Sequence, residues 1–192
     1  IIDLTAYLRL LLNCNDDVSF TRVVNVPPRG IGQRTLGELD RISRTHDMSL
    51  FQSINAILDS EYEEKVVKTQ LGPRAIKSLS AFRDLIWNIK SLLQTQDIVE
   101  LIDTIISETG YRKIFHEDEK SEERFENIQE YRSSAEDYLH MDNIEALTAF
   151  LENIALVSDV DSMSESSESI TLITLHQANC LLYTSDAADE GL

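Results

Sequence analysis

The stretch Asn25-Val26-Pro27-Pro28-Arg29-Gly30-Ile31-Gly32-Gln33-Arg34-Thr35 decides how the first part of this chain folds. Pro27 and Pro28 end any helix that precedes them, because proline has no backbone N–H and restricts the residue before it. The two glycines around Ile31 allow a tight hairpin, and we expect that apolar side chain to plug the core and hold the hairpin rigid. A new helix is expected over 33–45.

A hairpin of this composition is suited to contact with the phosphate backbone of a nucleic acid. At Gly30 and Gly32 the absence of a Cβ lets the backbone come close to a phosphate. The helix that follows offers unpaired N–H groups and the positive end of its dipole, while Arg29 and Arg34 add charge. Such a contact is made to the backbone rather than to the bases. An ordinary helix–turn–helix corner with exposed arginines is the alternative, and the Gly-x-Gly pattern alone favours that alternative.

Helices are expected through most of the chain, because apolar residues recur at helical spacing between polar or glycine breaks. Ser49 and Asp97 are the expected N-caps of two of these helices, the second in a capping box with Glu100. In the helix over 121–139, the pattern places Phe125, Ile128, Ala135 and Tyr138 inward. The expected helical segments are 1–10, 18–24, 33–45, 50–58, 73–93, 98–109, 121–139 and 142–154.

The C-terminal part of the chain changes character. The stretch 158–169 is rich in Ser, Asp and Glu and lacks periodicity, so we expect a solvated loop there. Residues 170–175 read Ile-Thr-Leu-Ile-Thr-Leu, which predicts the one strand of the chain. Because a lone strand leaves both its edges unpaired, it is expected to belong to a sheet whose other strands are largely absent.

The formal net charge of −17 is unevenly distributed. Residues 1–115 hold 14 Lys and Arg against 15 Asp and Glu, whereas residues 116–168 hold 3 against 16. A strongly acidic chain does not favour nucleic acid as a partner, but the five arginines within 21–45 face only Glu38 and Asp40. A local polyanion contact through 21–45 therefore remains open. A helical protein-interaction module, whose acidic part 116–168 docks a basic partner, is the alternative.

Length and composition exclude several classes of protein. With 192 residues and 42% apolar content, the chain is long enough for one domain with a core. No run of 18 apolar residues occurs, so no membrane partner is expected. Cys14 and Cys180 lie far apart, so no disulfide framework is expected and the cytoplasm is the expected location. The four histidines lack metal-ligand spacing, so no metal site is expected. The N-terminus, 1–4, lacks Met and is expected to be a cut edge.

Three separated blocks of the sequence resemble the UvrD/Rep/PcrA-type superfamily 1 DNA helicases in order and spacing. The first, 3–35, contains Ala-Tyr-Leu-Arg-Leu, Asn-x-x-Asp-Asp and Phe-x-Arg-Val-Val-Asn-x-Pro-x-Arg-Gly-Ile-Gly. The second, 124–130, reads Arg-Phe-Glu-Asn-Ile-x-Glu. The third joins Ala-Phe-Leu at 149–151 to Ile-Thr-Leu-Ile-Thr-Leu-His at 170–176. The resemblance covers roughly residues 1–178.

The resemblance implies a mainly α fold, in which a helical 2B subdomain with a helix-hairpin-helix is inserted into a RecA-like α/β motor subdomain, 2A. Residues 1–14 would end 2A, 15–157 would form 2B, 158–169 would be an acidic loop, and 170–178 would return to 2A as a strand. The hairpin would contact duplex DNA ahead of the fork, and the Thr-Leu-His block would lie near single-stranded DNA and the nucleotide. The implied DNA-binding residues, with Arg34 added for its charge, are Arg29, Gly30, Ile31, Gly32, Arg34, Thr35, Thr174 and His176.

The implied parent protein is an ATP-dependent DNA helicase that moves 3′ to 5′ in repair or replication, with ATP and Mg²⁺ as cofactors. No Gly-x-x-x-x-Gly-Lys-Ser/Thr loop occurs in this chain, so we expect it to bind neither cofactor, to hold no catalytic residue and to be inactive alone. The implied partners are duplex and single-stranded DNA, the missing 1A, 1B and 2A segments of the helicase, and repair or replication proteins.

The sequence departs from the family after Thr-Leu-His. The family continues with a small residue and then Ala-Lys-Gly-Leu-Glu-aromatic, whereas this chain reads Gln-Ala-Asn-Cys-Leu-Leu-Tyr at 177–183. The expected Lys, Gly and Glu are missing, and the following residues resemble translated sequencing-adapter read-through. We therefore expect 179–192 to be a non-native tail. A genuine divergent tail is the alternative.

Overall fold

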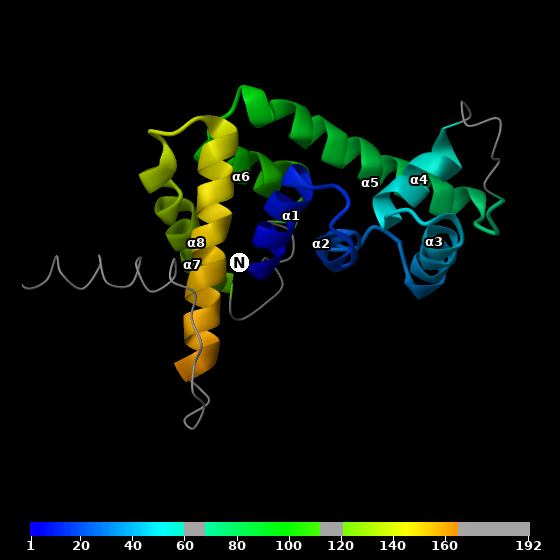
Figure 1. Ribbon diagram of the computed structural model, residues 1–192, viewed down its shortest axis with the longest axis horizontal. Coiled ribbons are helices and arrows are strands. Elements are labelled where there is room, and N and C mark those ends of the chain that lie inside the picture. Colours follow the sequence, from blue (N-terminus) through cyan, green and yellow to red (C-terminus); the bar gives the residue numbers. More distant parts are fainter. Residues whose placement is uncertain (60–67, 112–120, 165–192) are drawn as a thin grey trace, which may run out of the picture. The chain divides into compact units, whose positions relative to one another are not determined.

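The computed structural model describes residues 1–59, 68–111 and 121–164 (Figure 1). All regular structure within these residues is helical, which confirms the expectation of a mainly α fold. The expected strand at 170–175 lies outside the described residues. The described helices are α1 (Ile2–Leu12), α2 (Asp17–Val23), α3 (Gln33–His46), α4 (Leu50–Leu58), α5 (Pro73–Ser91), α6 (Ile98–Glu108), α7 (Ser121–Ser134) and α8 (Asn143–Ser164), with short 3₁₀ turns η1 (Leu92–Gln94) and η3 (Glu136–Tyr138).

Side-chain caps set the starts of two central helices, as the sequence predicted. Ser49 Oγ accepts the N–H of Gln52, and Gln52 Oε1 accepts the N–H of Ser49, so α4 begins in a capping box. Asp97 and Glu100 make the same reciprocal pair at the start of α6. Each box satisfies two backbone donors that a helix start otherwise leaves without partners.

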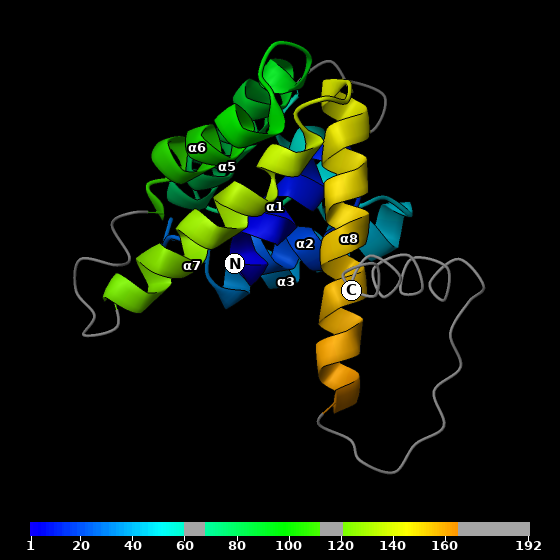
Figure 2. The ribbon, with the colours of Figure 1, turned by 90° about the vertical axis from the view of Figure 1, so that its left-hand side faces the viewer.

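The core of the first compact unit, residues 1–151, is built around α1. Helix α1 packs against α2, α5 and α6, and its buried face includes Leu4, Leu8 and Leu11 (Figures 1 and 2). The Phe20 ring makes edge-to-face contacts with Phe51 and Phe82, at centroid distances of 6.4 and 5.7 Å. These three rings join α2, α4 and α5, so the turn that follows α2 starts from a rigid base.

The contact between α7 and the first half of α8 also rests on aromatic rings. The Phe150 ring lies 5.1 Å from Tyr131 and 5.6 Å from Tyr138, centroid to centroid. The expectation that Phe125 faces inward is wrong, because this side chain is 49% exposed. The buried stripe of α7 consists of Ile128, which was correctly expected to face inward, and Tyr131, three residues apart on one helix face.

Helix α8 continues past the point where the sequence predicted a loop. The second unit is 152–192, of which the structure describes 152–164 as the C-terminal part of α8. The expected loop at 158–169 is therefore wrong for 158–164, and 165–169 lie outside the described residues. No Gly or Pro occurs between 152 and 164, so nothing in this stretch forces the helix to end. None of the helices described here has the length and apolar character that a membrane span needs.

Candidate nucleic-acid interface

The side chain of Asn25 shapes the hairpin between α2 and α3. Its Oδ1 accepts the N–H of Arg29 at 2.7 Å and the N–H of Ile31 at 3.2 Å. Between these two donors, Gly30 has φ +77°, in the left-handed region that glycine adopts without strain. Sequence reasoning missed Asn25, although Asn before a turn is a known signal because its side chain bonds backbone N–H groups a few residues on.

Ile31 and helix α5 hold the inner side of the hairpin, which faces the core. The Ile31 side chain is 1% exposed, which confirms that it plugs the core. A Cβ on Gly30 would lie 3.7 Å from Ser78 Oγ, so this turn of α5 passes directly beside the hairpin. Thr35 is also buried, and its N–H is bonded to the Gly32 carbonyl at 3.0 Å. Ile31 and Thr35 can therefore support the hairpin, while their buried side chains leave the outer surface to other residues.

The first turn of α3 presents backbone N–H groups outward. Its N-cap is Gly32, which has no side chain to accept them, and the turn holds no acidic residue. The N–H groups of Gly32, Gln33 and Arg34 have no acceptor among the described residues, and all three residues are exposed. Unpaired N–H groups at the positive end of a helix dipole are a favourable position for an anion.

Arg34 differs from the other four arginines of the stretch 21–45. It is exposed and makes no hydrogen bond or ion pair with any residue that the structure describes. The other four are engaged with acidic or backbone oxygens: Arg22 with Asp3 at 2.8 Å, Arg29 with carbonyls and a phenol, Arg41 with Glu38 at 2.9 Å, and Arg44 with Asp40 at 3.0 Å. Within the described part of 21–45, Arg34 is therefore the cation left available to a ligand.

Arg29 is only partly exposed, although we expected its charge, like that of Arg34, to be available at the hairpin. Its guanidinium is part-buried and donates to the carbonyls of Val23 and Pro27, at 3.1 and 3.2 Å, and to the hydroxyl of Tyr7 at 2.7 Å. A guanidinium has five donors in a planar fork, and these bonds direct several of them into the protein. The expectation was wrong because it considered only residues close to Arg29 in the sequence, whereas Tyr7, to which Arg29 donates, lies on α1.

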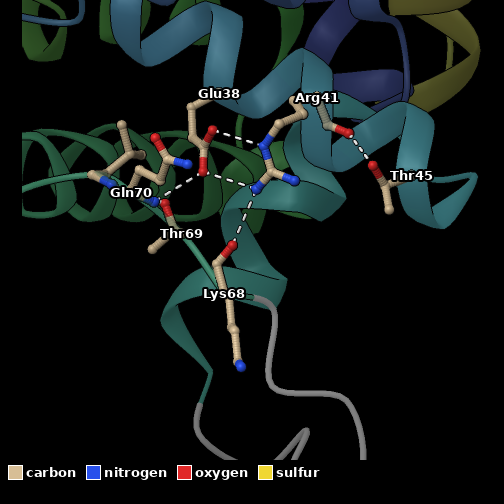
Figure 3. A network of polar contacts seen from close by, with 7 residues as sticks. Glu38, Arg41, Thr45, Lys68, Thr69 and Gln70 are labelled. Atoms are coloured by element: carbon tan, nitrogen blue, oxygen red, sulfur yellow. Dashed lines mark hydrogen bonds and ion pairs between the residues drawn. The ribbon is translucent and has the colours of Figure 1, made fainter.

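A second polar network holds α3 further along the helix. Glu38 accepts from Arg41 and from the N–H of Gln70 at 2.9 Å, and Arg41 also donates to the Lys68 carbonyl at 3.1 Å (Figure 3). The Arg41 hydrogen bonds and the Gln70 N–H lower the pKa of Glu38 to about 2. Glu38 therefore stays ionised over the physiological range and fixes residues 68–70 to α3, while Arg41 is occupied there.

Two site residues expected from the sequence, Thr174 and His176, lie outside the described residues. In the described part of the chain, no group of three His, Cys, Asp or Glu side chains is placed to hold a metal ion. The whole sequence lacks a Gly-x-x-x-x-Gly-Lys-Ser/Thr loop.

The block 124–130 presents mostly polar groups to solvent. Glu126 and Asn127 are exposed on α7. Arg124 is exposed as well and keeps polar interactions of its own. These residues add no further group to the surface around Arg34.

Comparison with known families identifies the chain. The UvrD-like helicase C-terminal domain family matches residues 1–183. This chain belongs to that family. The UvrD-like match extends into the first residues of the segment 179–192, which the sequence analysis expected to be non-native.

Curated relatives agree with this assignment to the UvrD-like family. The chain is 33% identical over 187 residues to the ATP-dependent DNA helicase PcrA of Bacillus subtilis (strain 168), covering 93% of this chain and 24% of that protein. It is 30% identical over 183 residues to the ATP-dependent DNA helicase PcrA of Staphylococcus aureus (strain Mu50 / ATCC 700699), with the same two coverages. The chain thus spans 24% of the length of these relatives.

Proposed function

We propose that this chain is part of an ATP-dependent DNA helicase. The observation that carries the proposal is the UvrD-like match over residues 1–183, together with relatives named as ATP-dependent DNA helicases. In the whole protein, ATP and Mg²⁺ would be bound by segments outside this chain, and movement along single-stranded DNA would run 3′ to 5′. Residues 1–14 and 170–178 would belong to the 2A motor subdomain, and 15–157 to the helical 2B subdomain.

Within that protein, the hairpin and the first turn of α3 would contact the duplex backbone. What supports this role is the coincidence of three features in one turn: a glycine N-cap, exposed N–H groups, and an arginine without a partner among the described residues. The groups that would touch phosphate are the N–H groups of Gly32, Gln33 and Arg34 and the Arg34 guanidinium. Gly30, Ile31 and Thr35 would act by shaping and supporting this turn.

Contacts to single-stranded DNA remain part of the proposal on the evidence of sequence alone. Thr174 and His176 follow the Thr-Leu-His pattern of the family, so their role would be exercised where the chain re-enters the motor. The remaining helicase segments 1A, 1B and 2A would be the direct partners of this chain. Repair or replication proteins would be partners of the assembled helicase.

Fluorescence anisotropy tests the DNA contact on the 192-residue chain, using a duplex with a 3′ single-stranded tail at several salt concentrations. One guanidinium and a helix N-terminus that together neutralise one or two phosphates predict a log–log salt slope of roughly −1 to −2. The acidic part of the chain opposes binding, so a dissociation constant of about 0.1 mM is expected at moderate salt. Binding that is absent, or that does not respond to salt, would contradict the proposal. The same preparation should hydrolyse no ATP above a blank without protein.

A protein-interaction module is the second candidate, and one observation favours it. Helix α7 exposes four carboxylates on its outer face together with the half-exposed ring of Phe125: Glu122, Glu123, Glu126 and Glu130. Such a face would suit a basic partner. Salt-sensitive binding of a lysine-rich peptide by a chain that does not bind the tailed duplex would favour this candidate over the first.

A further inference from the structure

Arg29 connects the hairpin to helices far away in the sequence. Its NH1 donates to the carbonyls of Val23 at the end of α2 and of Pro27 within the hairpin. Its NH2 donates to the hydroxyl of Tyr7 on α1 and to the carbonyl of Thr109, after α6, at 3.5 Å. One side chain therefore joins the hairpin to α1, α2 and the end of α6.

Aromatic rings complete the environment of this guanidinium. Arg29 Cζ lies 5.9 Å from the centroid of the Tyr7 ring and 5.5 Å from that of Phe82 on α5. Both rings are fully buried, so the cation is attracted to faces that water does not reach. The Tyr7 hydroxyl in turn donates to the Val26 carbonyl, one residue before the first proline of the hairpin.

Tyr7 is kept in the protonation state that this arrangement needs. Burial raises the pKa of Tyr7 to about 12, although the neighbouring Arg29 opposes the rise. A neutral phenol both donates and accepts, so the Tyr7 hydroxyl can donate to the Val26 carbonyl and at the same time accept a hydrogen bond from the Arg29 guanidinium. The pair Tyr7–Arg29 therefore ties the hairpin on both sides of its two prolines.

We propose that Arg29 is the positioning residue of the proposed DNA contact: it holds the hairpin so that the first turn of α3 meets the phosphate, and it does not touch phosphate itself. The inference rests on the proposed function of the hairpin. It separates two arginines only five positions apart, since Arg29 would act through the backbone of the turn and Arg34 through its own charge.

Substitution of each arginine by lysine distinguishes a positioning role of Arg29 from a phosphate contact by Arg34. An ammonium can replace a guanidinium as a point charge on phosphate, but it cannot reproduce a planar fork that donates to several oxygens beside two aromatic rings. Arg34→Lys should therefore keep the affinity for DNA within about twofold, whereas Arg29→Lys should weaken it about fivefold or more, because the turn loses its preorganised position. The salt slope of Arg29→Lys should equal that of the unmutated chain, since the number of phosphates neutralised in the complex is unchanged.

The experiment measures anisotropy of the tailed duplex at four salt concentrations for the unmutated chain, Arg29→Lys, Arg29→Ala, Arg34→Lys and Arg34→Ala. Circular dichroism establishes that each variant is folded at the temperature used. Tyr7→Phe keeps the ring and removes only the hydroxyl, so it tests the same tie in a variant that retains the packing of the core. Tyr7→Phe should weaken DNA binding with no change of the salt slope. If the Tyr7 hydroxyl only stabilised the fold, its loss would leave DNA binding unchanged under conditions where the variant is fully folded.

Amide hydrogen exchange reads the position of the hairpin without DNA. The N–H of Ile31, bonded to Asn25, should exchange faster in Arg29→Lys than in the unmutated chain and should be unchanged in Arg34→Ala. Wild-type affinity for Arg29→Lys, with a slope smaller by about 0.9 in Arg29→Ala, would assign Arg29 to phosphate and overturn the inference. If the unmutated chain shows no salt-dependent binding, the proposed function fails, and unchanged Ile31 exchange in Arg29→Lys would separately refute the positioning role.

Discussion

The first turns of α3 and α6 differ in what happens to their backbone N–H groups, which have no acceptor within the helix. Asp97 and Glu100 close the start of α6 with side-chain bonds of 2.9 and 3.2 Å, whereas α3 starts at Gly32 and its outer N–H groups are left unpaired among the described residues. Helix α5 also starts at a glycine, Gly72, but Pro73 at its first position removes one of the N–H groups. The start of α6 is closed by side chains, whereas the start of α3 keeps the donors that an anion needs.

Removal of the buried isoleucine at the start of α3 or of α6 should have the largest effect on stability. Ile31→Ala and Ile98→Ala each delete a side chain that is at most 2% exposed, so each should lower the free energy of unfolding by about 3 kcal/mol. Only Ile31→Ala should also weaken DNA binding at temperatures where the protein is folded. Urea unfolding and anisotropy measure the two quantities. Equal losses of DNA binding in both variants would mean that the start of α3 has no special role.

Exchange of the caps should have the next largest effect. Asp97→Ala removes one half of the capping box and should cost about 1 kcal/mol of stability, with no effect on DNA binding. Gly32→Asp should raise stability and weaken DNA binding. The substitution fits the fold, because a Cβ at Gly32 meets no atom within 4 Å and the φ of −93° suits any residue. The new carboxylate would cap α3, add up to about 1 kcal/mol of stability, and compete with phosphate for the same N–H groups.

The pair of measurements on Gly32→Asp is decisive because the two effects have opposite signs. Thermal unfolding should show a higher midpoint for this variant, and anisotropy should show a higher dissociation constant. Gly32→Ser is the matched control, since it offers a cap of the same kind without a charge that repels phosphate. A variant that is stabilised and binds DNA as well as the unmutated chain would refute the contact at the first turn of α3.

The Glu38 network should contribute the smallest effect, and a pH-dependent one. Glu38 has its pKa lowered from 4.5 to about 2 in the folded chain, so its contribution to stability is present above about 4.5 and is lost as the pH falls towards 2. Because Arg41 is half exposed, Glu38→Gln should cost at most about 1 kcal/mol near neutral pH. Urea unfolding at a series of pH values should show this difference shrink between pH 4.5 and pH 2; a constant difference would contradict the lowered pKa.

The sequence alone predicted what local chemistry determines. The caps Ser49 and Asp97 and the buried Ile31 were predicted correctly, because a cap or a periodic apolar residue depends on neighbours a few positions away. The inward course of Arg29 was not predicted, since its partners Tyr7 and Thr109 lie 22 and 80 positions away along the chain. Contacts of that separation are decided by packing of the helices and leave no local pattern.

The same distinction explains the two errors in the helical part. Phe125 and Tyr131 are both aromatic residues of α7, but Tyr131 is the one that meets distant partners, the Phe150 ring on α8 and the Thr5 hydroxyl on α1. The predicted loop from 158 rested on polar composition, which does not by itself exclude a helix. For α8 the absence of Gly and Pro up to Ser164 was the more informative signal.

The proposed phosphate contact at the start of α3 is best tested by the salt dependence of DNA binding in two single-arginine variants. Arg34 and Arg44 lie on the same helix and are both exposed, but Arg44 is paired with Asp40 near the C-terminal end of α3. Arg34→Ala and Arg44→Ala change the net charge equally, so any difference between them reports position. We expect a log–log slope smaller in magnitude by about 0.9 for Arg34→Ala and an unchanged slope for Arg44→Ala. Equal slopes in the two variants and the unmutated chain would show that the start of α3 makes no contact with phosphate.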